Sequence, residues 1–511
     1  MASSISTLVK DTAWYGLSTI LGRLLNWLLV PFYVRVLQTT GEYGIVTNLY
    51  AWTALLLVVL TYGMETGFFR FMNGSDTPSS VYKTSLVALL TTSSLFAIGV
   101  TLFAKPISIA LLGVNESEIV AMMAFIIASD AFMSIPYAHL RFKKQSKRFA
   151  FIKLVFVGVN IGLNLFFLLL CPYLYSLEPS SVSWCYRPDF GVHYIFLSNL
   201  IANAVVLALL LPTIFDRDQV REGHFSFSLL GRMLRYSIPL VLLGIAGIFN
   251  QMADKILFPF LYTNKEEAMA QLGIYGACFK IAVVMVLFTQ AFRYAFEPFF
   301  FEKTDSSNSD EEKRKKLALV TQYFWLFMLL IFLAVMAFVD LLKYFVVPEY
   351  YAGLAIIPWV MWGEMMMGIA LNLSTWYKLT NHTATGAVIS LVGCAVGVGL
   401  ILWGVPLFGF MACAWAIAIG NTLIVVLSYI LGQKHYPIPY NLSNALRGTL
   451  VAAVGYLLIA YSNAHAVGGW KWLFNLSVVV AFLVFLLYSE KPFRFALVRA
   501  AKKTLECIIS S

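Results

Sequence analysis

This sequence has very little charge for its length. Of its 511 residues only 12% are charged, whereas 60% are hydrophobic. Soluble domains carry about 25% charged residues, so the polar side chains here are too few to cover a soluble core. Apolar runs of about 20 residues, the length of a membrane-spanning helix, recur from end to end. They do not alternate in polarity over about 10 residues, which excludes a membrane β-barrel. The chain is therefore predicted to be an all-α polytopic membrane protein.

Signals for processing and for cysteine chemistry are also missing. The first apolar stretch continues to Leu37 without a small-residue cleavage site, so we interpret it as a retained span. No lipidation motif is present. The six cysteines include no CxxC pair, which excludes zinc and redox motifs of that kind. Cys171 and Cys185 could pair within one loop, although the scattered spacing favours free thiols.

Fourteen apolar segments are long enough to cross a membrane. Their predicted ranges are 12–37, 43–69, 84–104, 119–140, 150–171, 193–213, 235–261, 271–296, 319–341, 353–377, 385–405, 408–432, 445–462 and 470–489. Because this number is even, both ends of the chain are predicted to lie on the same side of the membrane.

Lysine and arginine are scarce on one side of the predicted membrane. With the N-terminus inside, the inner segments hold 25 of the 36 basic residues and the outer loops hold 5. Cytoplasmic loops typically show such an excess, so both termini are predicted to be cytoplasmic. The formal net charge of +10 thus reflects topology, and a basic loop such as RFKKQSKR does not indicate nucleic-acid binding.

The two halves of the chain resemble each other weakly. Tyr43-Gly44 opens the second predicted span, and Tyr275-Gly276 opens the eighth. We interpret the chain as two six-helix lobes in a parallel pseudo-repeat, an arrangement found among alternating-access transporters. The predicted divisions are an N-lobe at 1–215, a C-lobe at 216–440, two extra helices at 441–489 and a basic cytoplasmic tail at 490–511.

Charged residues inside the predicted spans are few, and most fall in the first two spans of each lobe. A charge at the middle of a membrane helix costs about 2.5–3.5 kcal/mol, so it usually faces protein or water. Arg23 lies near the middle of the first span and shares one helix stripe with Gly16, Thr19 and Asn26. It could contact an anionic substrate in a water-filled cavity, or it could form a structural hydrogen bond to a neighbouring helix.

The stretch FNQMADKILF places four polar or charged residues within six positions of the seventh span. Asn250 and Asp254 share one helix face, and Gln251 and Lys255 share the neighbouring face. One hypothesis is a cationic cavity wall formed by Lys255, Lys280 of the next span and the arginine of the first span, with Asp254 holding one of these cations. The alternative is an Asp254–lysine pair that only orients two helices.

Five further positions complete the candidate site. Glu65 and Arg70 lie at the cytoplasmic end of the second span, where Arg70 could contact headgroups or pair locally. Arg293 lies in the eighth span, four residues before an acid with which it is expected to pair. Asp130 and Glu364 occupy corresponding spans of the two lobes. Each is either a protonatable coupling site or a buried, hydrogen-bonded acid.

Several of these segments resemble a known family. They are the opening DTAWYGLSTILGRLLNWLLVPFYVRVLQTTGEYGIV, the ETGFFRF end of the second span, DKILFPF followed by LGIYG, and the paired Asn160 and Asn164 of VNIGLNLFF. On these residues the chain is similar to bacterial lipid-linked oligosaccharide flippases of the polysaccharide transporter family. That family belongs to the multidrug/oligosaccharidyl-lipid/polysaccharide (MOP) exporter superfamily.

The resemblance implies fourteen helices, a V-shaped central cavity and alternating access. It also implies movement of undecaprenyl-diphosphate-linked oligosaccharide units from the inner to the outer leaflet, for the biosynthesis of lipopolysaccharide or another surface polysaccharide. Cations in the cavity would hold the anionic diphosphate or acidic sugars. The positions that fit this role are Arg23, Arg70, Lys255, Lys280 and Arg293, with Asp254, Asn250, Gln251, Glu65, Asp130 and Glu364 as supporting or coupling residues.

Other functions stay open at this stage. A multidrug or cation antiporter of the same superfamily would be expected to carry acids in its cavity, and a lipid II flippase would carry more cavity arginines. An integral-membrane polysaccharide polymerase or ligase would need a large outer loop with catalytic side chains. The largest outer loop, 172–192, contains no DxD, GxSxG or histidine-rich metal spacing. The sequence therefore favours a transporter over an enzyme.

The expected setting follows from this interpretation. We expect no metal and no cofactor, with H⁺ or Na⁺ as the coupling ion if there is one. The expected location is the bacterial plasma membrane. The expected partners are the lipid-linked substrate, membrane lipids, and the polymerase and glycosyltransferases of the same pathway, and no nucleic acid is expected. A monomer is the expected state.

Overall fold

The fold is helical throughout the part of the chain that the computed structural model describes. This part comprises residues 21–22, 24–25, 27–74, 77–216, 222–290, 292, 310–380, 382–466 and 468–489. Within these residues, thirteen helical segments are long and apolar enough to cross a membrane, and a shorter apolar helix, Trp27–Val36, precedes them. The thirteen coincide with the second to fourteenth predicted spans, and most of the first span lies outside the described residues. The prediction of an all-α, multi-pass membrane protein is confirmed.

The chain divides into two compact units by its internal contacts. The first comprises Met1–Ala277 and Val405–Phe410, and the second comprises Cys278–Gly404 and Met411–Ser511. The seventh span belongs to the first unit because helix α11 packs on α2, α3 and α4. The predicted lobe boundary at residues 215 and 216 rests on the sequence repeat, and it stays a prediction.

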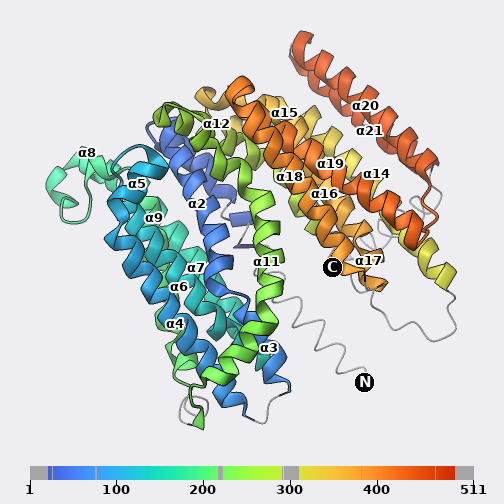
Figure 1. Ribbon diagram of the computed structural model, residues 1–511. Helices are drawn as coiled ribbons and strands as arrows, with labels where there is room; N and C mark the ends of the chain where they lie inside the picture. The colour runs from blue at the N-terminus through green and yellow to red at the C-terminus, as the bar shows by residue number, and fades with distance from the viewer. Residues whose placement is uncertain are drawn as a thin grey trace, which may run out of the picture. The chain divides into compact units, whose positions relative to one another are not determined.

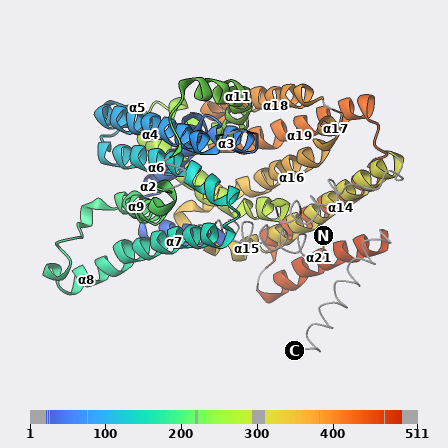
Figure 2. The same cartoon turned by 90° about the horizontal axis from the view of Figure 1, so that it is seen from below.

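The first unit is built around helix α6, which packs between α4 and α9, with α7 against α9 and α2 against α6 (Figures 1 and 2). Two of its spans contain two helices each: α2 and α3 belong to the span Thr40–Met72, and α7 and α8 belong to the span Ser146–Leu177. The helices are α2 (Thr40–Thr61), α3 (Met64–Met72), α4 (Pro78–Leu102), α5 (Ala104–Leu112), α6 (Ser117–Phe142), α7 (Ser146–Leu165), α8 (Cys171–Leu177), α9 (His193–Ile214), α11 (Phe227–Leu257) and α12 (Lys265–Ala282).

The second span is broken between α2 and α3. Tyr62 and Gly63 both adopt left-handed backbone conformations, with φ of 35° and 65°. Glycine suits position 63 for two reasons. It adopts the left-handed conformation without strain, and it has no Cβ atom, which would lie 2.8 Å from the side chain of Val241 on α11. The break starts a new helix that carries Glu65 in its first turn and Arg70 in its last. Met64 and Phe68 anchor that helix in the core of the unit.

The fifth span is longer than predicted. Helix α7 continues through a π-helical turn at Phe166–Leu170 into α8, which ends at Leu177. Cys171 begins α8, and Cys185 lies in the loop that follows. Both cysteines are free thiols, as their spacing favoured.

In the second unit, α14 packs against α16, α20 and α21, and α20 and α21 pack against each other (Figure 1). Asn441 caps α20, because its side-chain oxygen accepts a hydrogen bond from the backbone N–H of Asn444. The helices are α14 (Asp310–Ala337), α15 (Val339–Leu342), α16 (Ile357–Leu373), α17 (Thr375–Leu379), α18 (Thr383–Phe408), α19 (Phe410–His435), α20 (Leu442–His465) and α21 (Gly469–Ser489).

Candidate functional site

The first unit contains a cavity of about 400 Å³ within its membrane-spanning helices. Side chains from α2, α3, α6, α7 and α9 line it, so one unit forms it alone. Four of the lining residues are charged, and they comprise two acids and two bases. The lining residues are Leu57, Glu65, Asp130, Met133, Ser134, Tyr137, Arg141, Phe149, Lys153, Phe156, Asn203 and Val206. The lining charges therefore sum to zero when all four groups are ionised.

Glu65 and Arg141 form an ion pair at one end of this cavity. The helix break at Tyr62 and Gly63 determines the position of Glu65, because α3 starts only one residue before it. Arg141 lies near the end of α6, and its guanidinium carbon is 5.1 Å from the ring centroid of Phe69. About a third of the Arg141 side chain and two fifths of the Glu65 side chain remain exposed. The pair thus lies where the cavity meets the surface of the unit.

Asp130 and Lys153 form the second acid–base couple of the cavity. Asp130 lies in the middle of α6 and interacts electrostatically with Lys153 of α7. The Lys153 ammonium lies 4.1 Å from the centroid of the Tyr137 ring, within the range of a cation–π contact. Asn203 of α9 lines the cavity as well. A carboxyl, an ammonium, a phenol and an amide thus surround a space between helices, where polar groups are costly unless they have partners or water.

The Asp254–Lys255 stretch has a different environment. The Asp254 side chain is 2% exposed, and its Oδ2 accepts hydrogen bonds from Lys255 Nζ at 2.7 Å and from the Tyr275 hydroxyl at 2.5 Å. Asn48 of α2 donates to the Lys255 carbonyl at 2.8 Å. The Lys255 ammonium also lies 5.4 Å from the centroid of the Tyr275 ring. The charge of Lys255 is thus compensated by the adjacent residue in a packed environment.

The two Tyr-Gly pairs belong to one close helix crossing in the first unit. A Cβ atom at Gly44 would lie 1.9 Å from the carbonyl oxygen of Met269, and one at Gly276 would lie 2.3 Å from the hydroxyl oxygen of Thr47. At the nearby Gly273, a Cβ atom would lie 1.8 Å from the carbonyl oxygen of Thr40. Small residues allow membrane helices to approach closely, so these glycines permit the contact between α2 and α12. The crossing places Tyr275 beside Asp254. The repeated Tyr-Gly pattern therefore has a packing role here.

The other predicted site residues are spread over both units. Arg70 is exposed at the end of α3, with its guanidinium carbon 5.9 Å from the ring centroid of Tyr236. On α11, Asn250 is half-buried and Gln251 is exposed. In the second unit, Lys280 is exposed in the last turn of α12 and Glu364 is half-buried on α16. Arg23 and Arg293 lie outside the described residues. The hypothesis of a cationic wall formed by Lys255, Lys280 and Arg23 stays a prediction.

The structure brings together two residues that the sequence interpretation treated separately, Glu65 and Asp130. It also adds members that this interpretation left out of the site. In the sequence alone, Arg141 belongs to the basic loop RFKKQSKR, and no pattern there assigns a role to Lys153, Tyr137 or Asn203. A signal for α6 was present, because Asp130, Ser134, Tyr137 and Arg141 recur at spacings of four, three and four and so share one helix face.

Comparison with known proteins agrees with this architecture. Residues 8–302 match the model of a family described as polysaccharide biosynthesis protein, which is more than half of the chain. The chain belongs to this family. A search of curated proteins finds no match. The resemblance stated from the sequence motifs is confirmed at the level of the family.

Solved structures show the fold of this family member. It is similar to a structure of the lipid II flippase MurJ in an inward closed conformation, with a TM-score of 0.68 and 12% identity over 94% of this chain and 99% of that chain. It is also similar to an inward-facing multidrug resistance MATE family transporter of the MOP superfamily, with a TM-score of 0.57 and 14% identity over 81% and 94%. At these identities the likeness establishes the fold, which is that of MOP-superfamily flippases and transporters.

Proposed function

We propose that this protein is a flippase that moves undecaprenyl-diphosphate-linked oligosaccharide units from the inner to the outer leaflet of the bacterial plasma membrane by alternating access. Two findings together support the proposal. The chain belongs to a family described as polysaccharide biosynthesis protein. The fold of the chain is also similar to that of a lipid II flippase over nearly the whole of both chains. The product of such a pathway is a surface polymer, and a lipid-linked intermediate must cross the membrane before that polymer can form outside.

The charges support an anionic substrate through particular residues. Asp254 compensates the charge of Lys255, which makes Lys255 the weaker candidate for a diphosphate contact. Arg70 and Lys280 remain the stronger candidates among the described residues, since both are exposed within their units. Arg23 and Arg293 remain candidates from the sequence. Arginine suits a diphosphate because its planar fork can donate two parallel hydrogen bonds to phosphate oxygens.

The cavity of the first unit is the proposed coupling site, with a proton as the coupling ion. Its lining charges balance only while Asp130 is ionised, so protonation of Asp130 would leave Lys153 as an excess cation in a membrane-embedded space. Such a change alters the electrostatic free energy of the unit, because charges interact strongly where the dielectric constant is low. A sodium ion is less suited, since Lys153 would repel it. We propose that the proton exchanged at Asp130 drives the transport cycle.

Transbilayer movement of a labelled lipid tests the flippase proposal. The full-length protein is reconstituted into proteoliposomes that contain a fluorescent undecaprenyl-diphosphate oligosaccharide, and access to a membrane-impermeant quencher is followed over time. We expect movement with the wild type and a severalfold slower rate with Arg70→Ala. Lys83→Ala is the control, because it removes a cation from the first turns of the next helix, α4, and should leave the rate unchanged.

Two outcomes would redirect the assignment. Efflux of a lipophilic cation without movement of the labelled lipid would identify a multidrug antiporter, the function named for the MATE structure. Movement of lipid II in preference to the oligosaccharide lipid would identify a lipid II flippase, the function named for the MurJ structure. Equal rates for wild type and Arg70→Ala would retain the flippase but remove Arg70 from the substrate path.

A further inference from the structure

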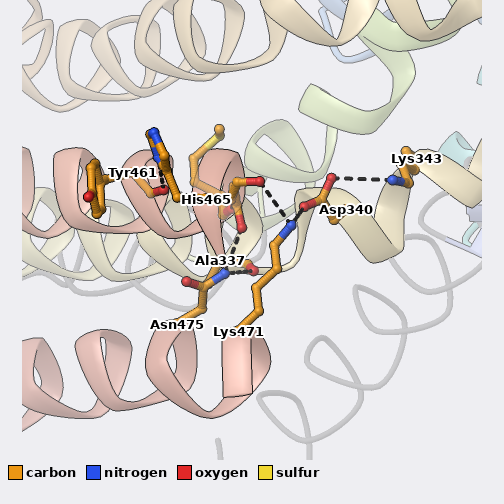
Figure 3. A network of polar contacts seen from close by, with 9 residues as sticks. Ala337, Asp340, Lys343, Tyr461, His465, Lys471 and Asn475 are labelled. Carbon is orange, nitrogen blue, oxygen red and sulfur yellow. Dashed lines mark hydrogen bonds and ion pairs between the residues drawn. The ribbon is translucent and has the colours of Figure 1, made fainter. Parts of the chain in front are cut away.

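A separate cluster of charges lies in the second unit, where α14 ends and α21 begins. Asp340 of α15 lies between Lys343 and Lys471, and both ammonium groups contact its carboxylate (Figure 3). The distance from Lys343 Nζ to Asp340 Oδ1 is 3.5 Å. We refer to these three residues as the Asp340 cluster. With one carboxylate and two ammonium groups, it carries a net charge of +1.

Neutral contacts beside the cluster hold the helices together. The side-chain amide of Asn475 on α21 donates to the carbonyl of Ala337 at 2.9 Å and to the side-chain oxygen of Asn463 on α20 at 2.8 Å. Asn475 is fully buried. Lys471 adds a hydrogen bond to the Asn463 carbonyl at 3.2 Å. Lys343 instead contacts groups within the segment 340–351: the Asp340 carboxylate and, at 5.7 Å and 5.9 Å from its ammonium, the ring centroids of Tyr344 and Tyr351. Helix packing therefore accounts for Asn475 and Lys471, but it does not account for Lys343.

The excess positive charge of the Asp340 cluster is unexpected on the predicted outer side of the membrane. Lys343 and Lys471 are two of only five basic residues on the predicted outer side of the membrane. Basic residues are depleted there in membrane proteins, so topology does not explain why two of them meet at one acid. The Lys343 side chain is 31% exposed and the Lys471 side chain is 14% exposed. A lysine ammonium has three donors, and each ammonium here retains at least one for a ligand.

Exposed aromatic residues accompany the Asp340 cluster. Tyr344 follows Lys343 and is 63% exposed, Tyr461 lies near the end of α20 and is 66% exposed, and Trp470 precedes Lys471 and is 80% exposed. Exposed tyrosine and tryptophan concentrate at the two membrane–water interfaces. The ammonium groups therefore lie next to residue types that are typical of the membrane–water interface, where lipid phosphates are found.

We propose that the Asp340 cluster binds the phosphate of an anionic lipid headgroup at the outer interface. The net charge, the free donors and the neighbouring interfacial residue types all fit a phosphate, which lysine binds as a compact point charge. This inference rests on the proposed function for its source of phosphate: the ligand is the diphosphate of the lipid-linked unit after it has crossed the membrane. Lys343 is the contacting residue, and Asp340 limits the affinity so that the product can leave.

Lipid binding to the intact protein tests this site. The full-length protein in phosphatidylcholine nanodiscs is titrated with undecaprenyl diphosphate, phosphatidylglycerol or inorganic pyrophosphate, and bound lipid is measured by native mass spectrometry. Lys343→Gln is expected to weaken undecaprenyl diphosphate binding about tenfold, the loss of one charge-assisted contact. Asp340→Asn is expected to strengthen it, because the cluster then carries a charge of +2. Lys105→Gln, which removes a predicted outer lysine elsewhere, should change nothing.

The outcomes separate the sources of phosphate. Lys343-dependent binding that favours undecaprenyl diphosphate supports the exit site. Equal Lys343-dependent binding of phosphatidylglycerol supports a lipid-phosphate site but overturns its role in product exit, and binding of inorganic pyrophosphate alone overturns the lipid site. Unchanged affinity in Lys343→Gln overturns the proposal altogether. If Asp340→Asn does not fold, recovery of affinity in Lys343→Arg replaces it as the second variant.

Failure of the proposed function would look different from failure of this site. A protein that binds undecaprenyl diphosphate through Lys343 but does not move the labelled oligosaccharide lipid keeps the site and loses the flippase assignment. A protein that moves the lipid at the wild-type rate in Lys343→Gln, with unchanged affinity, keeps the flippase assignment and loses the site.

Discussion

Two groups of charged residues in the first unit differ in one physical respect. Around the cavity, Glu65, Asp130, Arg141 and Lys153 line an open space of about 400 Å³. At the α2–α12 crossing, Asp254 is buried and receives hydrogen bonds from Lys255 and Tyr275. The first arrangement leaves room for a proton or water to enter and change the charge state. The second compensates its charges within the packing, so it is suited to holding helices and not to exchanging ions.

The largest expected effect comes from breaking the packed group. Asp254→Asn removes the carboxylate beside the buried Lys255 ammonium, and loss of one partner of a buried pair typically costs about 3–5 kcal/mol. We expect a strong fall in folded protein, measured by size-exclusion profile and thermal unfolding in detergent. The double variant Asp254→Asn with Lys255→Met should recover most of the loss, because no buried charge remains. A stable, wild-type-like Asp254→Asn protein would contradict the structural role of this pair.

Asp130→Asn is the matched change in the cavity. Like Asp254→Asn, it replaces an intramembrane aspartate by asparagine. Asp130 lines an open cavity, however, whereas Asp254 is packed against the Lys255 ammonium. We expect a change in thermal unfolding far smaller than that of Asp254→Asn. If Asp130→Asn unfolds the protein as severely, the distinction between an exchangeable and a structural group fails.

The close helix crossing gives the next largest effect. Gly273→Ala places a methyl group where the Thr40 carbonyl oxygen would be 1.8 Å away, so α2 and α12 must separate. Such overpacking typically costs about 1–3 kcal/mol, measured here as a lowered thermal unfolding midpoint. Gly158→Ala on α7 is the control, because nothing lies within 4 Å of its added methyl group. A neutral Gly273→Ala would show that the crossing is looser than the structure indicates.

A smaller effect is expected at the edge of the cavity. The Glu65–Arg141 pair is partly exposed, and ion pairs of this kind contribute about 0.2–1 kcal/mol. A double-mutant cycle with Glu65→Gln and Arg141→Gln, read by thermal unfolding, should give a coupling in that range. Transport should respond more strongly than stability, since both residues line the proposed coupling site. A coupling of several kcal/mol would indicate a buried structural pair. The Glu65–Arg141 pair would then not differ in kind from the Asp254–Lys255 pair.

The smallest effect concerns pH and lies outside the membrane-spanning segments. Asp216 follows α9 and receives contacts from Lys143 and from His139 Nε2, the latter at 3.3 Å. Burial by itself raises the pKa of Asp216, but these hydrogen bonds outweigh it and lower the pKa below its ordinary value. A lowered carboxyl pKa stabilises the fold above the unfolded pKa of about 4, and this contribution is lost as the pH falls through the folded pKa.

Asp216→Asn should therefore reduce the free energy of unfolding at neutral pH by less than about 1 kcal/mol, because the carboxyl is partly exposed. The difference from wild type should shrink as the pH falls below about 4, where an unfolded aspartate is protonated. Thermal unfolding of both proteins between neutral and acidic pH provides the measurement. A difference that grows on acidification would mean that Asp216 acts in the opposite sense.

The fold could be predicted from the sequence because the bilayer imposes a length and a composition on each helix. Thirteen of the fourteen predicted spans have a described counterpart, and the remaining one lies mostly outside the described residues. The break at Tyr62 and Gly63 was not predicted, since a single glycine in an apolar run does not by itself indicate a left-handed turn. The side chain of Val241, more than 170 positions away, makes a glycine necessary there.

The candidate site was harder to predict, because it depends on which faces of separate helices meet. Asp254 and Lys255 could be recognised as polar residues in a span, and the alternative of a helix-orienting pair was already open. Their partner Tyr275 was visible only as part of a Tyr-Gly repeat. For the cavity, the polar stripe on α6 was present in the sequence, but the positions of Lys153 and Asn203 depend on how α7 and α9 pack.

Proton-coupled flipping tests the central claim most directly. Proteoliposomes that contain the labelled undecaprenyl-diphosphate oligosaccharide are given a pH gradient, and lipid movement and internal pH are recorded together for wild type, Asp130→Asn and Lys83→Ala. We predict that the gradient accelerates movement in the wild type and in Lys83→Ala, and that Asp130→Asn abolishes both the acceleration and the accompanying proton flux while remaining folded. Gradient-driven movement with an unchanged proton flux in Asp130→Asn would contradict the account.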